Sequence, residues 1–333
     1  MSDAALTSSP GAGIGRARRL GAGVTRAVWP VLAVVAVIVA VWYAACLPMN
    51  VKEQLMQAER AGAVISPEGG QARRDMSPWV LMAQNPAHLG GVWSQDRPRL
   101  PAPHQVAVEL WDTTIGMALE GRAFSNRSLF THAWVTLSAT LLGFAIGTAL
   151  GILLAVGIVH NRAMDMSVMP WAIASQTIPI LAIAPMIIVV LNSVGLSGLI
   201  PKALISAYLS FFPVVVGMVK GLRSPDGMQL DLLRTYSASP GQTFWKLRLP
   251  ASMPYLFTSL KVGVAASLVG AIVGELPTGA VAGLGARLLA GSYYGQTVQI
   301  WSALFAAAIL AALLVGLIGL AQRAVLRRMG MAR

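Results

Sequence analysis

The sequence predicts an all-α polytopic membrane protein with six transmembrane helices. Of its 333 residues, 56% are hydrophobic and 11% are charged, and the mean hydropathy is +0.65. A chain so apolar and so poor in charge is unlike an ordinary soluble protein. Apolar stretches near the roughly 20 residues needed to cross a bilayer recur along it. The six expected spans are Trp29–Leu47, Ala133–Val159, Val168–Leu191, Ala203–Val219, Tyr255–Leu276 and Val298–Leu320.

The net charge of +12 is distributed unevenly along the chain. Residues 48–130 hold eight basic and eight acidic residues, so the excess lies in the spans and their short flanks. The joints 192–201 and 279–297 contain only Arg287. Positive flanks face the cytoplasm, so both termini are expected to lie inside. Because the basic excess follows the spans, it indicates contact with membrane lipid and not with nucleic acid. The basic flank residues are Arg16, Arg18, Arg19, Arg26, Lys220, Arg223, Arg234, Lys246, Arg248, Arg323, Arg327, Arg328 and Arg333.

Residues 1–28, rich in Gly, Ala, Ser and Arg, have no apolar periodicity and are expected to form a mobile cytoplasmic tail. The first helix, 29–47, follows, and residues 323–333 form a basic cytoplasmic tail. The single cysteine, Cys46, excludes an internal disulfide. It leaves two interpretations, a lipidated cysteine after a signal-like stretch or a small apolar residue at a helix end.

Residues 48–130 contain no stretch long enough to cross the membrane and are expected to be external. Lys52–Ala61 is typical of a short amphipathic helix. Ser66–Arg99 is expected to be a loop with Trp79 and Trp93 as anchors. Two interpretations remain open for this region, an elaboration that packs on the membrane surface and a contact surface for a partner protein.

The stretch Leu100–Leu119 opens with Leu-Pro-Ala-Pro and resembles the Leu-Pro-x-Pro motif that precedes an interfacial helix in the family described below, so an interfacial helix is expected here. The residues that would face lipid or protein are Val106, Leu110, Ile115 and Leu119. In the next span, glycines at close spacing predict tight helix packing, because apolar surface alone does not drive association in lipid. They are Gly143, Gly147, Gly151 and Gly157.

Polar residues within the spans are the candidates for a solute path. Glu275 is the only acidic residue inside an expected span, and it leaves two interpretations, a packing hydrogen bond or a gate. Prolines in the third span free backbone carbonyls, which membranes tolerate only where these are buried or line a cavity. A kink for packing is the alternative. The candidates are Gln176, Thr177, Pro179, Pro185, Asn192, Ser206 and Ser210.

The polar stretch Ser224–Pro250 interrupts this apolar chain. Met228–Tyr236 predicts a short helix and Ser237–Ser239 a break. Pro240 fits the first position of a second helix, which we expect to end at Pro250.

The stretch resembles the cytoplasmic signature loop of the membrane subunit of bacterial ABC importers. That loop has EAA, then Gly three residues later, then a hydrophobic-Leu-Pro ending. Here the positions hold Asp231-Leu232-Leu233, Ser237 and Arg248-Leu249-Pro250. Asp preserves the charge, whereas Ser replaces the residue that most easily adopts a left-handed turn. The flanks, with Pro213 and 221–223 upstream and 249–254 downstream, resemble the sulfonate, taurine and nitrate subfamily, and the resemblance covers about residues 100–320.

The resemblance implies a permease subunit of an ATP-driven importer in the bacterial inner membrane, with its permease core at 131–322 and its coupling loop at 224–250. It also implies a cytoplasmic ATP-binding subunit, a periplasmic or lipid-anchored solute-binding protein, and a homodimer, or a heterodimer with a second permease. The solute would be a sulfonate, nitrate or pyrimidine-like heterocycle, the last favoured by the departure of 274–279 from the sulfonate pattern. The implied coupling residues are Asp231, Leu232, Leu233, Arg234, Ser237, Ala238, Pro240, Leu249 and Pro250.

Other functions fit the sequence less well. The chain has no phosphate-binding glycine loop followed by Lys-Ser/Thr, so we expect ATP hydrolysis on a separate subunit and no cofactor or metal here. An ion-coupled secondary transporter, the main alternative, predicts inverted repeats and midplane charges. A membrane enzyme or assembly factor would need a catalytic constellation. The four scattered histidines, His88, His104, His132 and His160, do not form one.

Overall fold

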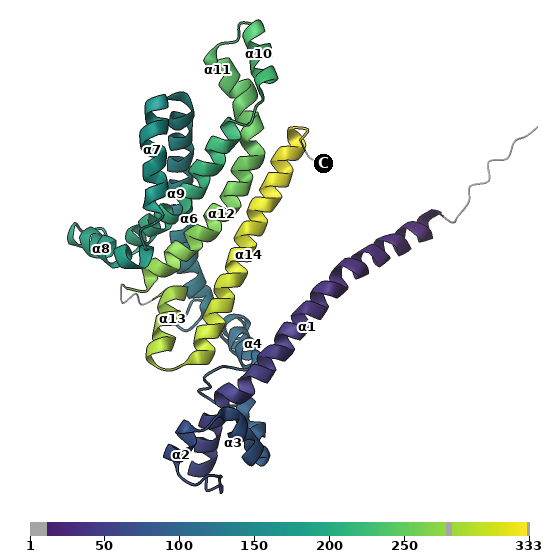
Figure 1. Cartoon of the computed structure of the whole chain (residues 1–333), viewed down its shortest axis with the longest axis vertical. Helices are drawn as coiled ribbons and strands as arrows, with labels where there is room; N and C mark the ends of the chain where they lie inside the picture. The colour runs from purple at the N-terminus through teal and green to yellow at the C-terminus, as the bar shows by residue number, and fades with distance from the viewer. Residues whose placement is uncertain (1–11, 278–281, 332–333) are drawn as a thin grey trace, which may run out of the picture. The chain divides into compact units, whose positions relative to one another are not determined.

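The computed structural model describes residues 12–277 and 282–331, and every regular element in that part of the chain is helical. The chain divides into two compact units, residues 1–105 and 106–333 (Figure 1). Residues 1–11 of the expected mobile tail lie outside the described residues. From Ala12 onward the backbone is helical and continues into the first span.

Unit 1 is built on the long helix α1, Ala12–Arg60. The expected first span and the expected amphipathic helix at 52–61 are one continuous helix, which passes through Pro30 and Pro48. Its apolar side chains from Trp29 to Val41 are mostly exposed, as expected for a helix that faces lipid in a membrane. The helical segment Trp29–Arg60 is long and apolar enough to cross a membrane.

The expected loop at 66–99 is wrong, because this segment folds into short helices with a small core. Val51 and Leu55 of α1 pack there with Ile65 and Leu81. Prolines at the first positions of two of the helices favour helix starts, and the buried Asn85 side chain bonds both N–H and C=O of Ser66. The short helices are α2, Gly70–Asp75, α3, Pro78–Gln84, and the 3₁₀-helix η1, Pro86–Trp93.

Unit 2 is a bundle in which α9 packs extensively against both α6 and α12, with α14 beside α12 (Figure 1). Together with α1, these make five helices in the described residues that are long and apolar enough to cross a membrane. This confirms the all-α polytopic fold. The bounds are Leu129–His160 for α6, Leu199–Leu222 for α9, Leu249–Glu275 for α12 and Thr297–Arg328 for α14.

Glycines of α6 bring its backbone against α9, as their spacing predicts. A Cβ at Gly143 would lie 2.3 Å from Cβ of Ser206, and one at Gly147 would lie 2.1 Å from Oγ of Ser210. Gly151 faces Val214 in the same way. The absence of side chains at these positions is therefore what allows the two helices to approach so closely.

The expected third span is wrong as a single helix. It is divided into α7, Arg162–Ser175, and α8, Ile180–Ser193, which are bent by 98° at the break. Pro179 cannot donate a backbone hydrogen bond, and the preceding residues turn instead of continuing the helix. Neither half is long enough to cross a bilayer core alone, and the sixth span exists only if the pair counts as one.

Several short helices connect or precede the long ones. The expected interfacial helix is present as a continuous helical run, whose first part belongs to unit 1 and whose remainder belongs to unit 2. The segment before α14 contains a helix that the sequence did not predict. The bounds are Pro103–Trp111 for α4, Asp112–Gly116 for the π-helix η2, Met117–Leu119 for α5 and Leu284–Tyr293 for α13.

The two predicted helices of the polar stretch are present at the end of the bundle opposite α13 (Figure 1). The expected end at Pro250 is wrong, because the second helix continues without a break into α12. A π-helical turn precedes Pro250, and Leu249 N–H bonds the carbonyl of Phe244 within it. The elements are α10, Gly227–Thr235, α11, Pro240–Thr243, and the π-helix η3, Phe244–Arg248.

Candidate functional site

The coupling element, residues 224–250, starts each of its two helices with a capping box. Asp226 accepts a hydrogen bond of 2.8 Å from Gln229 N–H, and the Gln229 side chain accepts one from the backbone of Asp226. Ser239 and Gln242 repeat the arrangement at the start of α11. Each box satisfies two backbone donors, so these short helices are stabilised locally.

The turn between the helices keeps the left-handed geometry although serine stands at the glycine position. Ser237 has φ of 50°, the only positive φ of a non-glycine residue in the described chain. Its N–H bonds the carbonyl of Arg234 at 2.8 Å, and Ala238 N–H bonds that of Leu233 at 3.0 Å. This pair of bonds is the Schellman motif that ends a helix. The turn therefore keeps its geometry with serine in place of the family's glycine.

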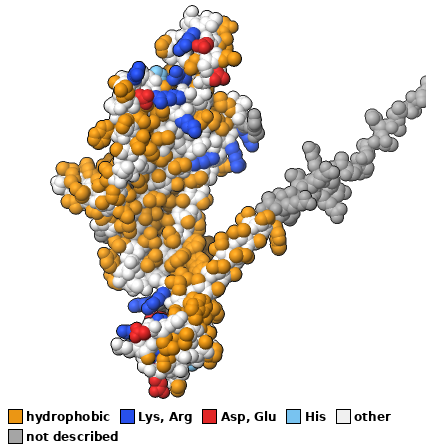
Figure 2. Space-filling model, viewed as in Figure 1, with side chains coloured by type: hydrophobic (Ala, Val, Ile, Leu, Met, Phe, Trp, Pro, Cys, Tyr) orange, Lys and Arg blue, Asp and Glu red, His pale blue; other side chains and the backbone are white. Residues whose placement is uncertain are grey.

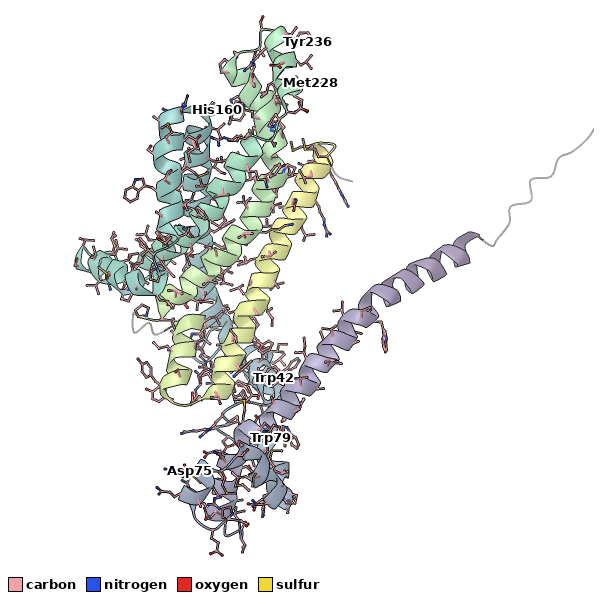
Figure 3. All side chains as sticks on the ribbon, in the orientation of Figure 1. Trp42, Asp75, Trp79, His160, Met228 and Tyr236 are labelled. Atoms are coloured by element: carbon pink, nitrogen blue, oxygen red, sulfur yellow. The ribbon has the colours of Figure 1, made fainter. Side chains whose placement is uncertain are left out.

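One face of α10 is apolar and exposed. Met228 is 83% exposed, Leu232 56% and Tyr236 76%, and their four-residue spacing aligns them along the helix. Figure 3 shows Met228 and Tyr236 at the tip of the bundle. Asp231 and Arg234 form an exposed ion pair of 3.0 Å beside them. Such a pair contributes little to stability by itself.

The base of the coupling element is anchored to the bundle. Phe244 packs on a buried core cluster from α6 and α9 and meets the ring of His160 edge-on, with centroids 5.4 Å apart. Arg223, next to the element, pairs with Asp165 of α7 at 2.8 Å. The element is thus a projection of the bundle whose base is packed on α6, α7 and α9.

The predicted coupling residues all lie on this element. The more exposed ones are Asp231, Leu232, Arg234, Ser237 and Pro240, whereas Leu233, Ala238, Leu249 and Pro250 are half-buried. Figure 2 shows hydrophobic side chains covering the visible side of the bundle, with charged side chains near the end that carries α10 and α11.

At the opposite end of the bundle, Glu275 is completely buried. Its carboxylate accepts hydrogen bonds from the hydroxyl of Thr136, at 2.9 Å, and from Gly285 N–H, at 2.8 Å. Gly285 lies in the first turn of α13, where backbone donors have no partner within the helix. Glu275 therefore caps a helix from outside it, and the carboxylate also suits the positive end of the helix dipole.

Two side chains of α6 complete this Glu275 anchor. Thr136 Oγ1 accepts a hydrogen bond of 2.8 Å from Leu284 N–H, and His132 Nδ1 accepts one of 3.0 Å from Gly283 N–H. Gly283 has φ of 131°, and a Cβ there would lie 2.3 Å from the Glu275 carboxyl carbon. Only glycine fits this position. The anchor joins α6, α12 and α13.

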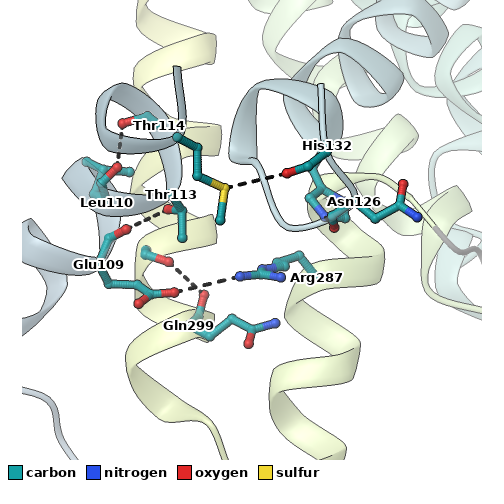
Figure 4. Close-up of polar contacts among 11 residues, drawn as sticks. Glu109, Leu110, Thr113, Thr114, Asn126, His132, Arg287 and Gln299 are labelled. Atoms are coloured by element: carbon teal, nitrogen blue, oxygen red, sulfur yellow. Dashed lines mark hydrogen bonds and ion pairs between the residues drawn. The ribbon is translucent and has the colours of Figure 1, made fainter. Parts of the chain in front are cut away.

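Further along α13, Arg287 pairs with Glu109 of α4 at 3.7 Å (Figure 4). Burial lowers the pKa of the Arg287 guanidinium, and the Glu109 carboxylate acts in the opposite direction. Its Nε is buried with no hydrogen-bond partner in the described chain. Arg287, the one basic residue of its joint in the sequence, therefore fixes α13 to α4.

The predicted path residues do not gather at one place. Gln176, Thr177 and Pro179 are exposed at the break between α7 and α8, and Asn192 is exposed near the end of α8. Ser206 and Ser210 are fully buried in the contact of α9 with its neighbours. Ser206 bonds Ser267 of α12, which in turn bonds the carbonyl of Thr140 in α6. These hydroxyls hold helices together in this conformation, and a path role for the set stays a prediction.

Sequence reasoning missed three parts of these sites. The capping boxes have a recognisable pattern, Asp or Ser followed three residues later by Gln. Thr136, a partner of Glu275, and His132, which accepts from Gly283 N–H, had no such signal, because they lie 139 and 151 residues from the groups that they bond. Helix α13 was also missed.

Comparison with known proteins identifies the family. Residues 147–331 match the model of the binding-protein-dependent transport system inner membrane component. The formylaminopyrimidine transport permease protein ThiX of Halalkalibacterium halodurans is 32% identical over 186 residues, which cover 56% of this chain and 68% of that protein. The riboflavin transport system permease protein RibX of Chloroflexus aurantiacus is 31% identical over 228 residues, which cover 68% of this chain and 80% of that protein.

More distant relatives include the nitrate import permease protein NrtB of Leptolyngbya laminosa, 27% identical over 223 residues, covering 66% of this chain and 73% of that one. An inward-facing structure of the MetNI methionine ABC transporter aligns with a TM-score of 0.44 and 20% identity, over 69% of this chain and 97% of that chain. The matched family covers more than half of the sequence and contains the coupling element. This chain belongs to the family of binding-protein-dependent transport system inner membrane components, as an ABC importer permease.

Proposed function

We propose that the coupling element docks on a separate cytoplasmic subunit that hydrolyses ATP, and that this contact drives the permease. The observation that carries the proposal is the exposed apolar face of Met228, Leu232 and Tyr236 on a capped, anchored helix. Apolar side chains presented together at a tip favour a protein contact, and Asp231 and Arg234 would set its register.

The proposed solute is a pyrimidine-like heterocycle. The two relatives above that exceed 30% identity are named for formylaminopyrimidine and riboflavin, both of which are nitrogen heterocycles. The nitrate permease is less similar. An external solute-binding protein would deliver this solute to a permease dimer, whose second copy or homologous partner completes the path. Uptake of a labelled pyrimidine by cells, competed by riboflavin or nitrate, tests this choice.

The proposed orientation places residues 48–130 outside and the coupling element inside, and it is supported by the basic flanks. In a Cys46→Ala background, Ser94→Cys and Ser239→Cys are labelled in intact cells with a membrane-impermeant maleimide. We expect labelling at position 94 alone, since both side chains are exposed in the folded chain. Labelling at position 239 alone would reverse the topology.

The docking proposal is tested by removing the apolar face. Leu232→Ala combined with Tyr236→Ala should reduce ATP hydrolysis stimulated by the loaded binding protein by about tenfold or more, since central apolar anchors carry most of the energy of an interface. The variant should remain inserted and keep its melting temperature, because both side chains are exposed.

Trp79→Ala is the matched control for this test. Trp79 is similarly exposed but lies in unit 1, so its loss should leave stimulated ATP hydrolysis unchanged. Normal coupling by the Leu232 and Tyr236 double variant would refute docking through this face.

A further inference from the structure

Unit 1 contains a basic pocket of about 430 Å³. Four basic side chains and one acidic side chain contribute to its wall, so the pocket favours an anion. A pocket of this volume can hold a small polar group. Its lining residues are Lys52, Glu53, Met56, Gly70, Arg73, Arg74 and Arg99.

Arg73, which lines this basic pocket, has a donor that no group in the described part of the chain uses. Its side chain is only 6% exposed, and one guanidinium nitrogen, Nη2, pairs with Glu59. The other nitrogen, Nη1, is buried without a hydrogen-bond partner in the described chain. A buried donor left unsatisfied is costly, and an oxygen of a bound anion would satisfy it.

The surroundings hold Arg73 in place. Lys52 of α1 donates a hydrogen bond of 2.7 Å to the backbone carbonyl of Arg74, which fixes α2 against α1. The paired Glu59 neutralises part of the charge, and Glu53 a further part. The four cations still outnumber these two carboxylates.

The position of the pocket along α1 sets its height relative to the membrane. Lys52 follows Leu47, the last residue of the apolar stretch, by five residues in a continuous helix. At 1.5 Å per residue this is about 7 Å. The headgroup layer extends roughly 5–7 Å beyond the hydrocarbon core, so the Lys52 side chain reaches it.

The segment that carries Arg99 returns to the same level. Trp93 Nε1 donates to the carbonyl of Tyr43 at 3.2 Å, and Trp42 Nε1 donates to that of Pro101 at 3.0 Å. Trp42 and Tyr43 are aromatic residues at the end of the span, where such side chains mark the interface. Arg99 therefore lies between two residues that are fixed to the membrane end of unit 1.

We propose that the basic pocket binds a phosphate group at the membrane surface, on the side where the first span ends. Arginine forks match phosphate oxygens in pairs, and the unused Nη1 of Arg73 supplies one such donor. The height of the pocket favours an anionic lipid headgroup as the source of the phosphate. Free phosphate has the same chemistry, so the test separates the two.

The test removes lipid from the full permease in detergent, adds phosphatidylglycerol, and measures the bound phosphatidylglycerol by native mass spectrometry. Arg74→Gln with Arg99→Gln removes two exposed cations of the pocket. The control, Arg60→Gln with Arg97→Gln, removes two exposed cations of unit 1 that do not line it. Removing two charges should weaken phosphatidylglycerol binding by about tenfold or more. The control should bind like the wild type.

A second measurement adds inorganic phosphate to lipid-free micelles and follows the melting temperature. A phosphate-induced rise that only the pocket variant loses, without selective lipid retention, assigns the site to the free anion. Equal retention by wild type and pocket variant with no response to phosphate overturns the proposal, as does an equal loss in the control. If the double variant melts early without ligand, Arg99→Gln alone replaces it, because that exposed side chain has no part in the core.

Discussion

At each end of the bundle in unit 2, a residue with positive φ lies next to a short helix, but the surroundings of the two residues differ. At the coupling element, the turn residue is Ser237, with φ of 50°, and the helix beside it exposes its apolar face. At the Glu275 anchor, the residue with positive φ is Gly283, and a buried carboxylate lies against it. The coupling element exposes an apolar surface, whereas the Glu275 anchor is buried between helices.

The two ends differ in how far apart in the sequence their hydrogen-bonded residues lie. The capping boxes of the coupling element join residues three apart, so its shape depends on local sequence. In the Glu275 anchor, Glu275 and Gly285 are ten residues apart, but the bonds to α6 join residues 139 to 151 apart, so its geometry requires α6, α12 and α13 to be packed together. The shape of the coupling element therefore does not depend on contacts between distant helices. The bonds of the Glu275 anchor, by contrast, form only when α6, α12 and α13 keep their arrangement.

The largest expected effect is therefore at Glu275. Glu275→Ala leaves Gly285 N–H without an acceptor and should destabilise the protein by about 3 kcal/mol, measured as a loss of thermal stability in detergent. Glu275→Gln should cost about 1 kcal/mol or less. Its amide oxygen can accept from Gly285, while its amide donates to Thr136, whose hydroxyl can turn to the His132 carbonyl at 3.1 Å.

The same pair of variants separates an anchor from a gate. Uptake in proteoliposomes should remain normal for Glu275→Gln if the residue only holds helices together. A stable Glu275→Gln protein with a changed transport rate, or with a changed preference for charged solutes, would assign Glu275 to the path.

Gly283→Ala should have the next largest effect, a loss of about 2 kcal/mol, because the new methyl group meets the Glu275 carboxyl and φ is unfavourable. The measurement is a double-mutant cycle, in which the melting temperatures of the wild type, the two single variants and the double variant are compared. In the Glu275→Ala background the clash is gone, so the loss caused by Gly283→Ala should shrink. Strictly additive losses would mean that the methyl group does not act on the carboxylate.

The sequence predicted the local features of this molecule better than the long-range ones. Apolar stretches located the spans, glycine spacing located the contact of α6 with α9, and Pro240 marked a helix start. The break after Ser175 was underestimated, because a proline inside a span predicts a kink but not its angle.

Residues 66–99 and Glu275 required the structure. A segment with few apolar residues builds a core only because α1 continues beyond the membrane and supplies Val51 and Leu55. Thr136 and His132 are ordinary helix residues in the sequence, and only packing brings them to Glu275 and Gly283. Interactions between distant residues leave no periodic signal, whereas caps and turns do.

The smallest expected effect tests the other end of the comparison. Ser237 adopts a left-handed conformation that glycine takes without a steric cost, and no side-chain hydrogen bond of Ser237 holds it there in the described structure. Ser237→Gly should therefore change stability by less than about 1 kcal/mol, with the relief of strain partly offset by the greater freedom of the unfolded chain. Ser237→Ala, which keeps a Cβ, is the matched control and should resemble the wild type. Melting curves measure stability, and ATP hydrolysis stimulated by the loaded binding protein measures coupling, which both variants should retain. A large loss of coupling in Ser237→Gly alone, at unchanged stability, would contradict the locally fixed turn, because it would mean that rigidity from the serine Cβ is needed to transmit force through α10.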